Sequence, residues 1–356
     1  MAYTNIDDPS AYFQTALWTG NGSAGNAVTF DGNSDMQPDL VWSKRRDVGL
    51  HHVWKDTSRG GTSNNDQHLV SSLTNAESTY ATYRMDFNSD GFTLDAAGDT
   101  GFQGNGTSMV SWAWKANGGT TSSNTDGSIT STVQANQDAG FSIVQYTGTG
   151  TAATIGHGLG VAPAMYIVKN RDQQGTDWTV FHKDLTSNAY SLYLSSTAAQ
   201  SNSVGYWNST SPTSTVFSIK NTSGDVNTNT EDYVVYCFAE KQGYSKFGKY
   251  VGNGNANGPF VYTGFKPAFI LHKCSTSGRA WYLYDTKRLG YNGGNSYLQA
   301  QDTDVESSNS VLDITSNGFK LRTTSTQMNQ NAATFIYMAF AENPFTTSTG
   351  IPTTAR

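Results

Sequence analysis

The chain of 356 residues has few charged residues and almost no cysteine: charged residues make up 14% of it, and it contains 2 Cys. Soluble proteins typically carry roughly a quarter of their residues as charged ones. Cys237 and Cys274 are too few for a disulfide framework and too far apart for a zinc site. Both stand in apolar runs, so we expect two buried free thiols.

Positive charge is also sparse. The formal net charge is -6, and the densest basic stretch is Lys44-Arg45-Arg46. A nucleic-acid-binding protein needs a basic face to neutralise phosphates, and none is visible in the sequence. We therefore expect no nucleic-acid partner.

Long apolar runs are missing as well. No stretch approaches the 18 or so residues of a membrane-spanning helix, and we expect no membrane association. Residues 1–9 have neither the basic nor the apolar part of a secretory signal. The composition is typical of an exposed extracellular β protein. Release by cell lysis, as for virion proteins, would reconcile this composition with the missing signal, although a cytosolic protein would also lack a signal.

Aromatic residues and turn formers are abundant. Phe, Trp and Tyr make up 12% of the chain, and there are 36 Gly. Many Thr and Tyr together with Gly and Asn turns are typical of strands and tight connections. The composition predicts a folded, all-β protein.

One pattern occurs three times. Trp18, Tyr146 and Tyr250 are each followed two residues later by Gly-x-Gly, then by a Pro and an apolar run. A Lys closes each run six residues after the Pro, and these are Lys44, Lys169 and Lys273. Each copy ends in a strongly apolar run, such as Val234-Val-Tyr-Cys-Phe, which indicates a central strand covered on both faces. Copies of about 100 residues are longer than solenoid repeats, so each should have a core.

These copies predict three consecutive antiparallel β-sandwich modules with a jelly-roll-like architecture. We place the first at residues 1–117, the second at 140–244 and the third at 245–345. Residues 118–139 are rich in Gly, Ser and Thr and are predicted to be a flexible linker. Residues 346–356 are predicted to be a tail. The second and third modules have almost no spacer and should sit rigidly against each other.

No motif in the sequence carries a complete set of catalytic or metal-binding residues. Residues 148–153 resemble part of a dinucleotide fingerprint, but Pro163 and a strand follow where a helix is needed. His157 lies in this loop without companions at ligand spacing, and surface or strand positions are expected for all six histidines, which are His51, His52, His68, His157, His182 and His272. Asp31-Gly-Asn-Ser-Asp35 resembles the start of an EF-hand, but Met36 and Trp42 break the pattern. Irregular calcium binding by these loops stays open.

Paired carboxylates across a cleft would indicate a glycosidase. Asp285, Glu240 and Glu342 are candidates, but Glu240 and Glu342 occupy equivalent positions of two modules, which favours an architectural role. Tyr206-Trp207 could stack on a sugar, although covering its own module's core is the favoured interpretation. No Gly-x-Ser-x-Gly elbow is present. We expect no catalytic residue, no cofactor and no metal ligand.

Several short segments of the chain are shared with a known family: Tyr146-Thr-Gly, Gly156-His-Gly-Leu-Gly, Trp178-Thr-Val, Tyr236-Cys-Phe-Ala-Glu, Gly243-Tyr-Ser-Lys-Phe-Gly, Tyr284-Asp-Thr-Lys-Arg and Ala341-Glu-Asn-Pro-Phe. In these segments the chain resembles an uncharacterised repeat family common in structural proteins of tailed, often marine, bacteriophages. The likeness covers nearly the whole chain and is strongest from about residue 140 to 345; the first module departs most, with His52 in place of Trp and Lys115 after its last strand. The resemblance implies a role on the virion surface and brings no catalytic residues.

We therefore expect a non-enzymatic virion structural protein, as a tail fibre or receptor-binding protein or as a head decoration or fibre protein. The alternative is a carbohydrate-binding, lectin-like protein with or without weak glycan hydrolase activity, and a cytosolic scaffold is a third class. The expected partners are other virion proteins, a host surface glycan or receptor, and further copies of the chain in a homo-oligomer, with a trimer as our expectation.

Overall fold

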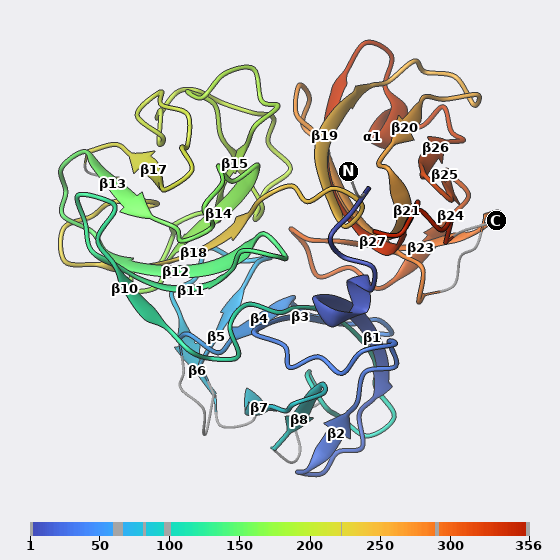
Figure 1. Cartoon of the computed structure of the whole chain (residues 1–356), viewed down its shortest axis with the longest axis horizontal. Helices are drawn as coiled ribbons and strands as arrows, with labels where there is room; N and C mark the ends of the chain where they lie inside the picture. Colours follow the sequence, from blue (N-terminus) through green and yellow to red (C-terminus); the bar gives the residue numbers. More distant parts are fainter. Residues whose placement is uncertain are drawn as a thin grey trace.

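The computed structural model describes residues 3–59, 67–80, 83–95, 101–221, 223–288 and 292–353. Strands account for 42% of the chain and helices for 2%, which confirms the predicted all-β fold. The strands form several antiparallel sheets in three lobes around a common centre (Figure 1).

The first module, blue to cyan in Figure 1, has a six-stranded sheet in the order β1-β9-β3-β4-β5-β6 and a small sheet in the order β2-β8-β7. A 3-10 helix, η1 (Pro9–Ala11), precedes them. The strands are β1 (Phe13–Thr19), β2 (Asn26–Val28), β3 (Leu40–Arg45), β4 (Val53–Asp56), β5 (Gln67–Val70), β6 (Ser78–Thr79), β7 (Met85–Phe87), β8 (Phe92–Leu94) and β9 (Ser108–Trp114).

The second module, green to yellow, has a seven-stranded sheet in the order β10-β11-β12-β18-β14-β15-β16 and the pair β13-β17. Its strands are β10 (Ser122–Asn124), β11 (Ser131–Asn136), β12 (Phe141–Thr147), β13 (Ala153–Gly156), β14 (Met165–Asn170), β15 (Thr179–His182), β16 (Leu192–Tyr193), β17 (Val216–Ile219) and β18 (Asp232–Phe238).

The third module, orange to red, has a six-stranded sheet in the order β19-β27-β21-β22-β23-β24 and a small sheet in the order β20-β26-β25. The strands are β19 (Ser245–Val251), β20 (Phe260–Tyr262), β21 (Phe265–Cys274), β22 (Trp281–Asp285), β23 (Asn295–Gln299), β24 (Ser307–Asn309), β25 (Leu312–Thr315), β26 (Gly318–Leu321) and β27 (Thr334–Pro344). One helical turn, α1 (Thr326–Asn329), precedes β27.

The three modules share one connectivity. In each, the last strand lies between the strand that precedes the Gly-x-Gly motif and the strand that carries the repeated Lys, as β9 lies between β1 and β3. The equivalent strands β18 and β27 hold the same central place in their sheets. This arrangement confirms that the apolar run ending each repeat is a central strand.

The first glycine of each Gly-x-Gly lies against neighbouring backbone. A Cβ added to Gly20, Gly148 or Gly252 would lie 2.3, 2.1 or 2.2 Å, respectively, from a carbonyl oxygen of the strand connection beside it. Only glycine fits so close an approach. The glycine motif is therefore part of the module's construction, as the sequence indicated.

The predicted linker at 118–139 is wrong. Residues 122–124 and 131–136 form β10 and β11, and β11 pairs with β12 through Val133↔Val144 and its neighbours. Val133 is buried while Thr132 is exposed, as expected for a strand with one covered face. The Gly- and Ser-rich composition of this segment indicated a linker, although its Thr and Val residues suit the pleated surface of a strand.

Each module has its own core between its large and small sheets, as predicted. The first is built around Val41 and Phe92, the second around Tyr166 and Phe217, and the third around Ile270. These clusters hold the two sheets of each sandwich together.

A further cluster is shared by all three modules at the centre of the molecule. Trp54 contacts Trp178 at a ring-centroid distance of 5.1 Å, and Phe238 contacts both Trp114 and Phe340 at 6.1 Å. The outer face of each large sheet therefore packs on the other two modules and not on solvent, so the modules depend on one another.

Candidate functional site

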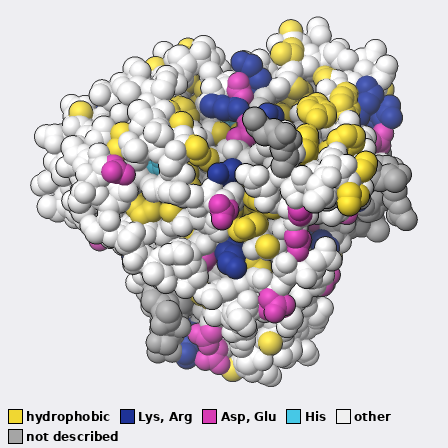
Figure 2. All heavy atoms as spheres, viewed as in Figure 1, with side chains coloured by type: hydrophobic (Ala, Val, Ile, Leu, Met, Phe, Trp, Pro, Cys, Tyr) yellow, Lys and Arg dark blue, Asp and Glu magenta, His cyan; other side chains and the backbone are white. Residues whose placement is uncertain are grey.

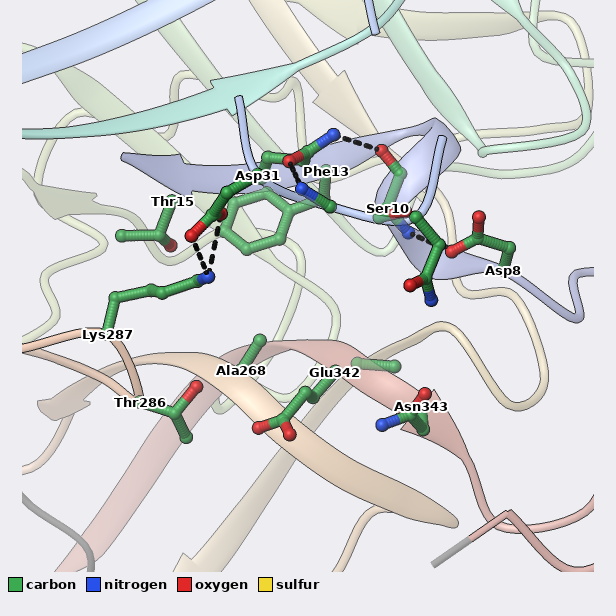
Figure 3. Close-up of a pocket in the computed structure, with 14 residues that line it drawn as sticks. Asp8, Ser10, Phe13, Thr15, Asp31, Ala268, Thr286, Lys287, Glu342 and Asn343 are labelled. Atoms are coloured by element: carbon green, nitrogen blue, oxygen red, sulfur yellow. Dashed lines mark hydrogen bonds and ion pairs between the residues drawn. The ribbon is translucent and has the colours of Figure 1, made fainter. Parts of the chain in front are cut away.

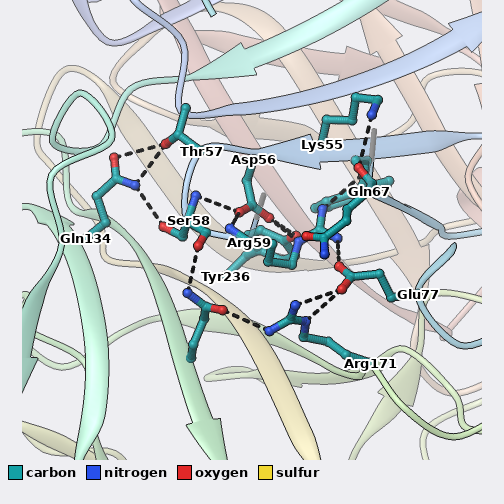
Figure 4. A network of polar contacts seen from close by, with 12 residues as sticks. Lys55, Asp56, Thr57, Ser58, Arg59, Gln67, Glu77, Gln134, Arg171 and Tyr236 are labelled. Carbon is teal, nitrogen blue, oxygen red and sulfur yellow. Dashed lines mark hydrogen bonds and ion pairs between the residues drawn. The ribbon is translucent and has the colours of Figure 1, made fainter. Parts of the chain in front are cut away.

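A buried ionic network joins the first module to the second (Figure 4). The Arg59 guanidinium pairs with Asp56 at 2.5 Å and also with Glu77, and Glu77 in turn pairs with Arg171 of the second module at 2.7 Å. The side chains of Asp56 and Arg59 are 0% and 1% exposed. The Tyr236 hydroxyl donates to Asp56 at 2.7 Å, so this network spans the interface.

A second network with an equivalent arrangement joins the third module to the first. Arg288 pairs with Asp285 at 2.6 Å, and Glu306 pairs with Arg46 of the first module at 2.7 Å. The Trp112 indole donates to Asp285 at 2.9 Å, in the place that Tyr236 takes in the other interface. Asp285, a candidate catalytic carboxylate from the sequence, is thus a buried architectural residue.

The interface between the second and third modules has a neutral version of this network. The Gln200 backbone N–H donates to the Ser275 carbonyl at 2.8 Å. In the other two interfaces, the backbone N–H groups of Glu77 and Glu306 make the equivalent bonds to the carbonyls of Arg171 and Arg46. His182 stands at the position of Asp56, and its Nδ1 accepts from the Asp184 backbone at 3.1 Å. Burial lowers the pKa of His182 to about 4, so the imidazole is neutral at pH 7.

The lysine that closes each repeat is buried in all three modules. Lys169 donates to the Thr176 carbonyl at 2.8 Å, Lys273 to the Thr197 carbonyl at 2.9 Å and Lys44 to the Arg45 carbonyl at 2.7 Å. Burial lowers the pKa of each lysine to about 8. Their partners are backbone carbonyls, so these lysines tie strand connections in place.

The other candidate carboxylates are ion-paired. Glu240 binds Lys183 at 2.8 Å and also Lys246, and Glu342 binds Lys266 at 2.8 Å. Burial works against ionisation of Glu240, but the two lysines hold its pKa below the usual value. This pairing supports the architectural interpretation of the two repeat-equivalent residues.

The histidines lie apart from one another. His157 is buried, accepting from the Leu159 backbone at 3.2 Å and lying 3.2 Å from the Thr213 carbonyl. The Trp42 indole donates to His52 at 2.8 Å. Among the residues that the structure describes, no three His, Cys, Asp or Glu side chains gather as a metal site would require. The prediction of a surface or strand position is wrong for His52 and His157, because both are buried in connections outside the strands.

Two further sequence interpretations are confirmed. Cys237 and Cys274 are buried free thiols, and burial raises the pKa of Cys237. Tyr206 and Trp207 are buried in the core of the second module, with the Trp207 indole donating to the Tyr190 carbonyl at 3.1 Å. This pair therefore covers the module's core and offers no open surface to a sugar.

A cleft of about 370 Å³ lies between the first and third modules (Figure 3). The Lys287–Asp31 ion pair, at 2.7 Å, crosses from one module to the other at its edge. The Thr15 hydroxyl lines the cleft, buried and without a hydrogen-bond partner, while Phe13 is only 3% exposed. Asp31, a candidate calcium ligand, is thus held by a lysine. No pattern in the sequence predicts this cleft, because the cleft depends on how two modules pack.

No helix within the described ranges is long and apolar enough to cross a membrane. Searches of curated proteins and of solved structures find no match for the chain. A family described as a domain of unknown function, DUF7483, matches residues 8–344. The match runs through all three modules, which agrees with their shared centre. The chain therefore belongs to the DUF7483 family.

Proposed function

We propose that the chain is a non-enzymatic structural protein exposed on the surface of a bacteriophage particle, as a tail fibre or receptor-binding protein or as a head decoration or fibre protein. The observation that carries this proposal is the position of the buried ionic groups between modules. Asp56, Arg59, Asp285 and Arg288 lie in module interfaces, where they join parts of the chain. The resemblance to repeats of tailed-phage structural proteins supports the same role.

The architecture suits an exposed building block. Three sandwiches share one aromatic centre, and the surface is polar with little charge, as the spheres of Figure 2 show over most of the visible face. A virion protein must keep its shape outside the cell, and a large shared core serves that need.

Immunogold labelling of intact particles tests the proposal, together with mass spectrometry of gradient-purified virions. We expect label on the tail or the head and peptides of the chain in the purified virion. Absence of the chain from purified particles, with presence in infected cells, would support the cytosolic scaffold instead.

The proposed oligomer is tested separately. One chain already contains a threefold arrangement of modules, so a homotrimer would carry nine sandwiches. Sedimentation equilibrium distinguishes a particle of 38.4 kDa from one about three times heavier.

A second candidate function is carbohydrate binding, with or without weak hydrolysis. A groove on the third module with an exposed aromatic ring favours binding. Assay of sugar release from host polysaccharide tests the hydrolytic part, and no release would leave binding alone.

A further inference from the structure

The three modules differ at the outward positions of one equivalent strand. β2, β13 and β20 each place one apolar residue inward, which are Val28, Ile155 and Val261. The residues on either side of the inward one face outward. They are Ala27 and Thr29 in the first module, Thr154 and Gly156 in the second, and Phe260 and Tyr262 in the third.

Only in the third module are both outward side chains aromatic. Phe260 is 47% and Tyr262 is 55% exposed. Hydrophobic side chains gather over this module at the upper right of Figure 2. The equivalent positions of the other modules hold small residues, so the sandwich does not require rings here.

In the second module the chain covers the same place. The Ser128 backbone donates to the Thr154 hydroxyl at 2.9 Å, and a Cβ on Gly156 would lie 1.7 Å from the Asn124 amide oxygen. The segment between β10 and β11 therefore lies over β13. Over β20, Tyr3 reaches the end of the strand, where its hydroxyl donates to the Gly264 carbonyl at 2.5 Å and lies 3.5 Å from the Tyr262 hydroxyl.

A groove of about 430 Å³ adjoins Tyr262, between the third module and the end of the second. Its polar side chains include Glu240, Gln242 and Lys246. Lys246 and Glu240 are 35% and 29% exposed and paired with each other, and the Gln242 side chain is exposed. Gly264, beside Tyr262, leaves room for the Tyr3 hydroxyl, which would lie 2.6 Å from a Cβ added there.

The size of this surface favours a small ligand over a protein partner. An aromatic side chain buries about 150–250 Å². Two rings on the three-residue β20 therefore supply about 300–500 Å², against about 800 Å² per partner in a stable protein interface. The groove volume lies within the range of small-molecule sites, about 300–1,000 Å³.

The chemistry favours a neutral, hydroxyl-rich ligand. A tyrosine ring offers an apolar face to the C–H side of a sugar ring, and its hydroxyl can hydrogen-bond at the edge. Gln242 offers both a donor and an acceptor, which matches sugar hydroxyl groups. The charges in the groove are paired with each other, so it has little attraction for an ionic ligand. The cleft between the first and third modules has no comparable exposed ring.

We propose that the groove lined by Tyr262, Gln242, Glu240 and Lys246 binds a neutral oligosaccharide, with one sugar ring stacked on Tyr262. This proposal rests on the proposed virion-surface role for its biological setting, in which the groove contacts a host glycan. The binding itself is a property of the purified chain.

Calorimetric titration of the full chain with cellohexaose, mannohexaose and chitohexaose, each to about 10 mM, tests the proposal. We expect saturable binding of at least one, with saturation transfer in NMR to its ring protons. Tyr262→Ala should weaken that binding about ten-fold or more, and Tyr262→Phe should keep most of it because the ring remains. Tyr80→Ala, which removes a ring 57% exposed in the first module, is the matched control and should bind as the unchanged chain does.

No binding by any of the three sugars overturns the proposal. Equal loss of sugar binding in Tyr80→Ala and Tyr262→Ala also overturns it, as does equal loss of binding in Tyr262→Phe and Tyr262→Ala. If Tyr262→Ala instead changes the sedimentation of the chain and no sugar binds, the face is a contact between copies. Absence of the chain from virions would overturn the virion role and leave the titration result standing, so the two failures are distinguishable.

Discussion

The indole nitrogen of Trp178 donates a hydrogen bond to the backbone carbonyl of Val70, 3.0 Å away in the preceding module. Trp281 makes the same contact with Tyr193 at 2.8 Å, from the third module to the second. His52 holds the equivalent position in the first module, but its Nε2 is buried without a hydrogen-bond partner in the described part of the chain. Indole hydrogen bonds thus join the second module to the first and the third module to the second.

Trp178→Phe should destabilise the protein by about 1–3 kcal/mol. The Val70 carbonyl loses its buried donor, and a smaller ring leaves space in the shared core. Urea denaturation followed by fluorescence measures the change. Trp18→Phe is the control, because Trp18 is half-buried at the edge of its module and should lose less. Equal losses would contradict a special role for the contact between modules.

Arg59→Ala should cost about 3–5 kcal/mol in the free energy of unfolding. It leaves the Asp56 carboxylate, whose side chain is 0% exposed, and Glu77 without their shared partner. Arg322→Ala breaks a pair in which Arg322 is 48% exposed, and this control should change stability by about 1 kcal/mol or less. Chemical denaturation of both variants at pH 7 provides the comparison, and similar values would mean that burial of the network has little effect.

The repeat is the part of the fold that the sequence predicts best. Its glycines, its buried Lys169 and its central strand β18 are each required locally, so the same residue types recur. The sequence also predicts that β18 is covered on both faces, but it does not predict which surface covers the second face. That surface is the other two modules, and no local pattern tells packing between modules from packing within one.

The ionic networks and the groove on the third module were harder to predict. Asp56-Thr-Ser-Arg59 and Asp285-Thr-Lys-Arg288 are visible repeats, yet His182 and Leu185 stand at the matching positions of the second module. The network partners also come from different modules, so their spacing along the chain carries no signal. In the sequence, Phe260 and Tyr262 are ordinary strand residues. Only the alignment of β20 with β2 and β13 in the structure shows that they face outward.

Residues 118–244, which include β10 and β11, should not fold cooperatively when expressed alone. The fragment keeps the core around Tyr166 and Phe217 but exposes the rings that face the molecule's centre, including Trp178 and Phe238. Such a large apolar face favours aggregation or a loosely packed state. Amide NMR dispersion and dye binding to exposed apolar surface are the measurements. A well-dispersed spectrum and a sharp thermal transition would show that the module is independent after all.

His182 should make stability fall as the pH drops below 6.5. Burial lowers its pKa to about 4 in the folded chain, against about 6.5 when unfolded, so between these values the unfolded state binds the extra proton. The contribution of the neutral imidazole is complete above pH about 6.5, is lost as the pH falls toward about 4, and amounts to about 3 kcal/mol. Urea midpoints at pH 7, 5.5 and 4.5 measure it.

His182→Gln removes this titration, so its stability should fall less over the same pH range than that of the unchanged chain. His51→Gln, at an exposed site, is the matched control and should keep most of the original pH dependence. Some dependence should persist in His182→Gln, because burial also lowers the pKa of His272, to about 3. An unaltered pH profile in His182→Gln would show that the interface between the second and third modules does not rely on this imidazole being uncharged.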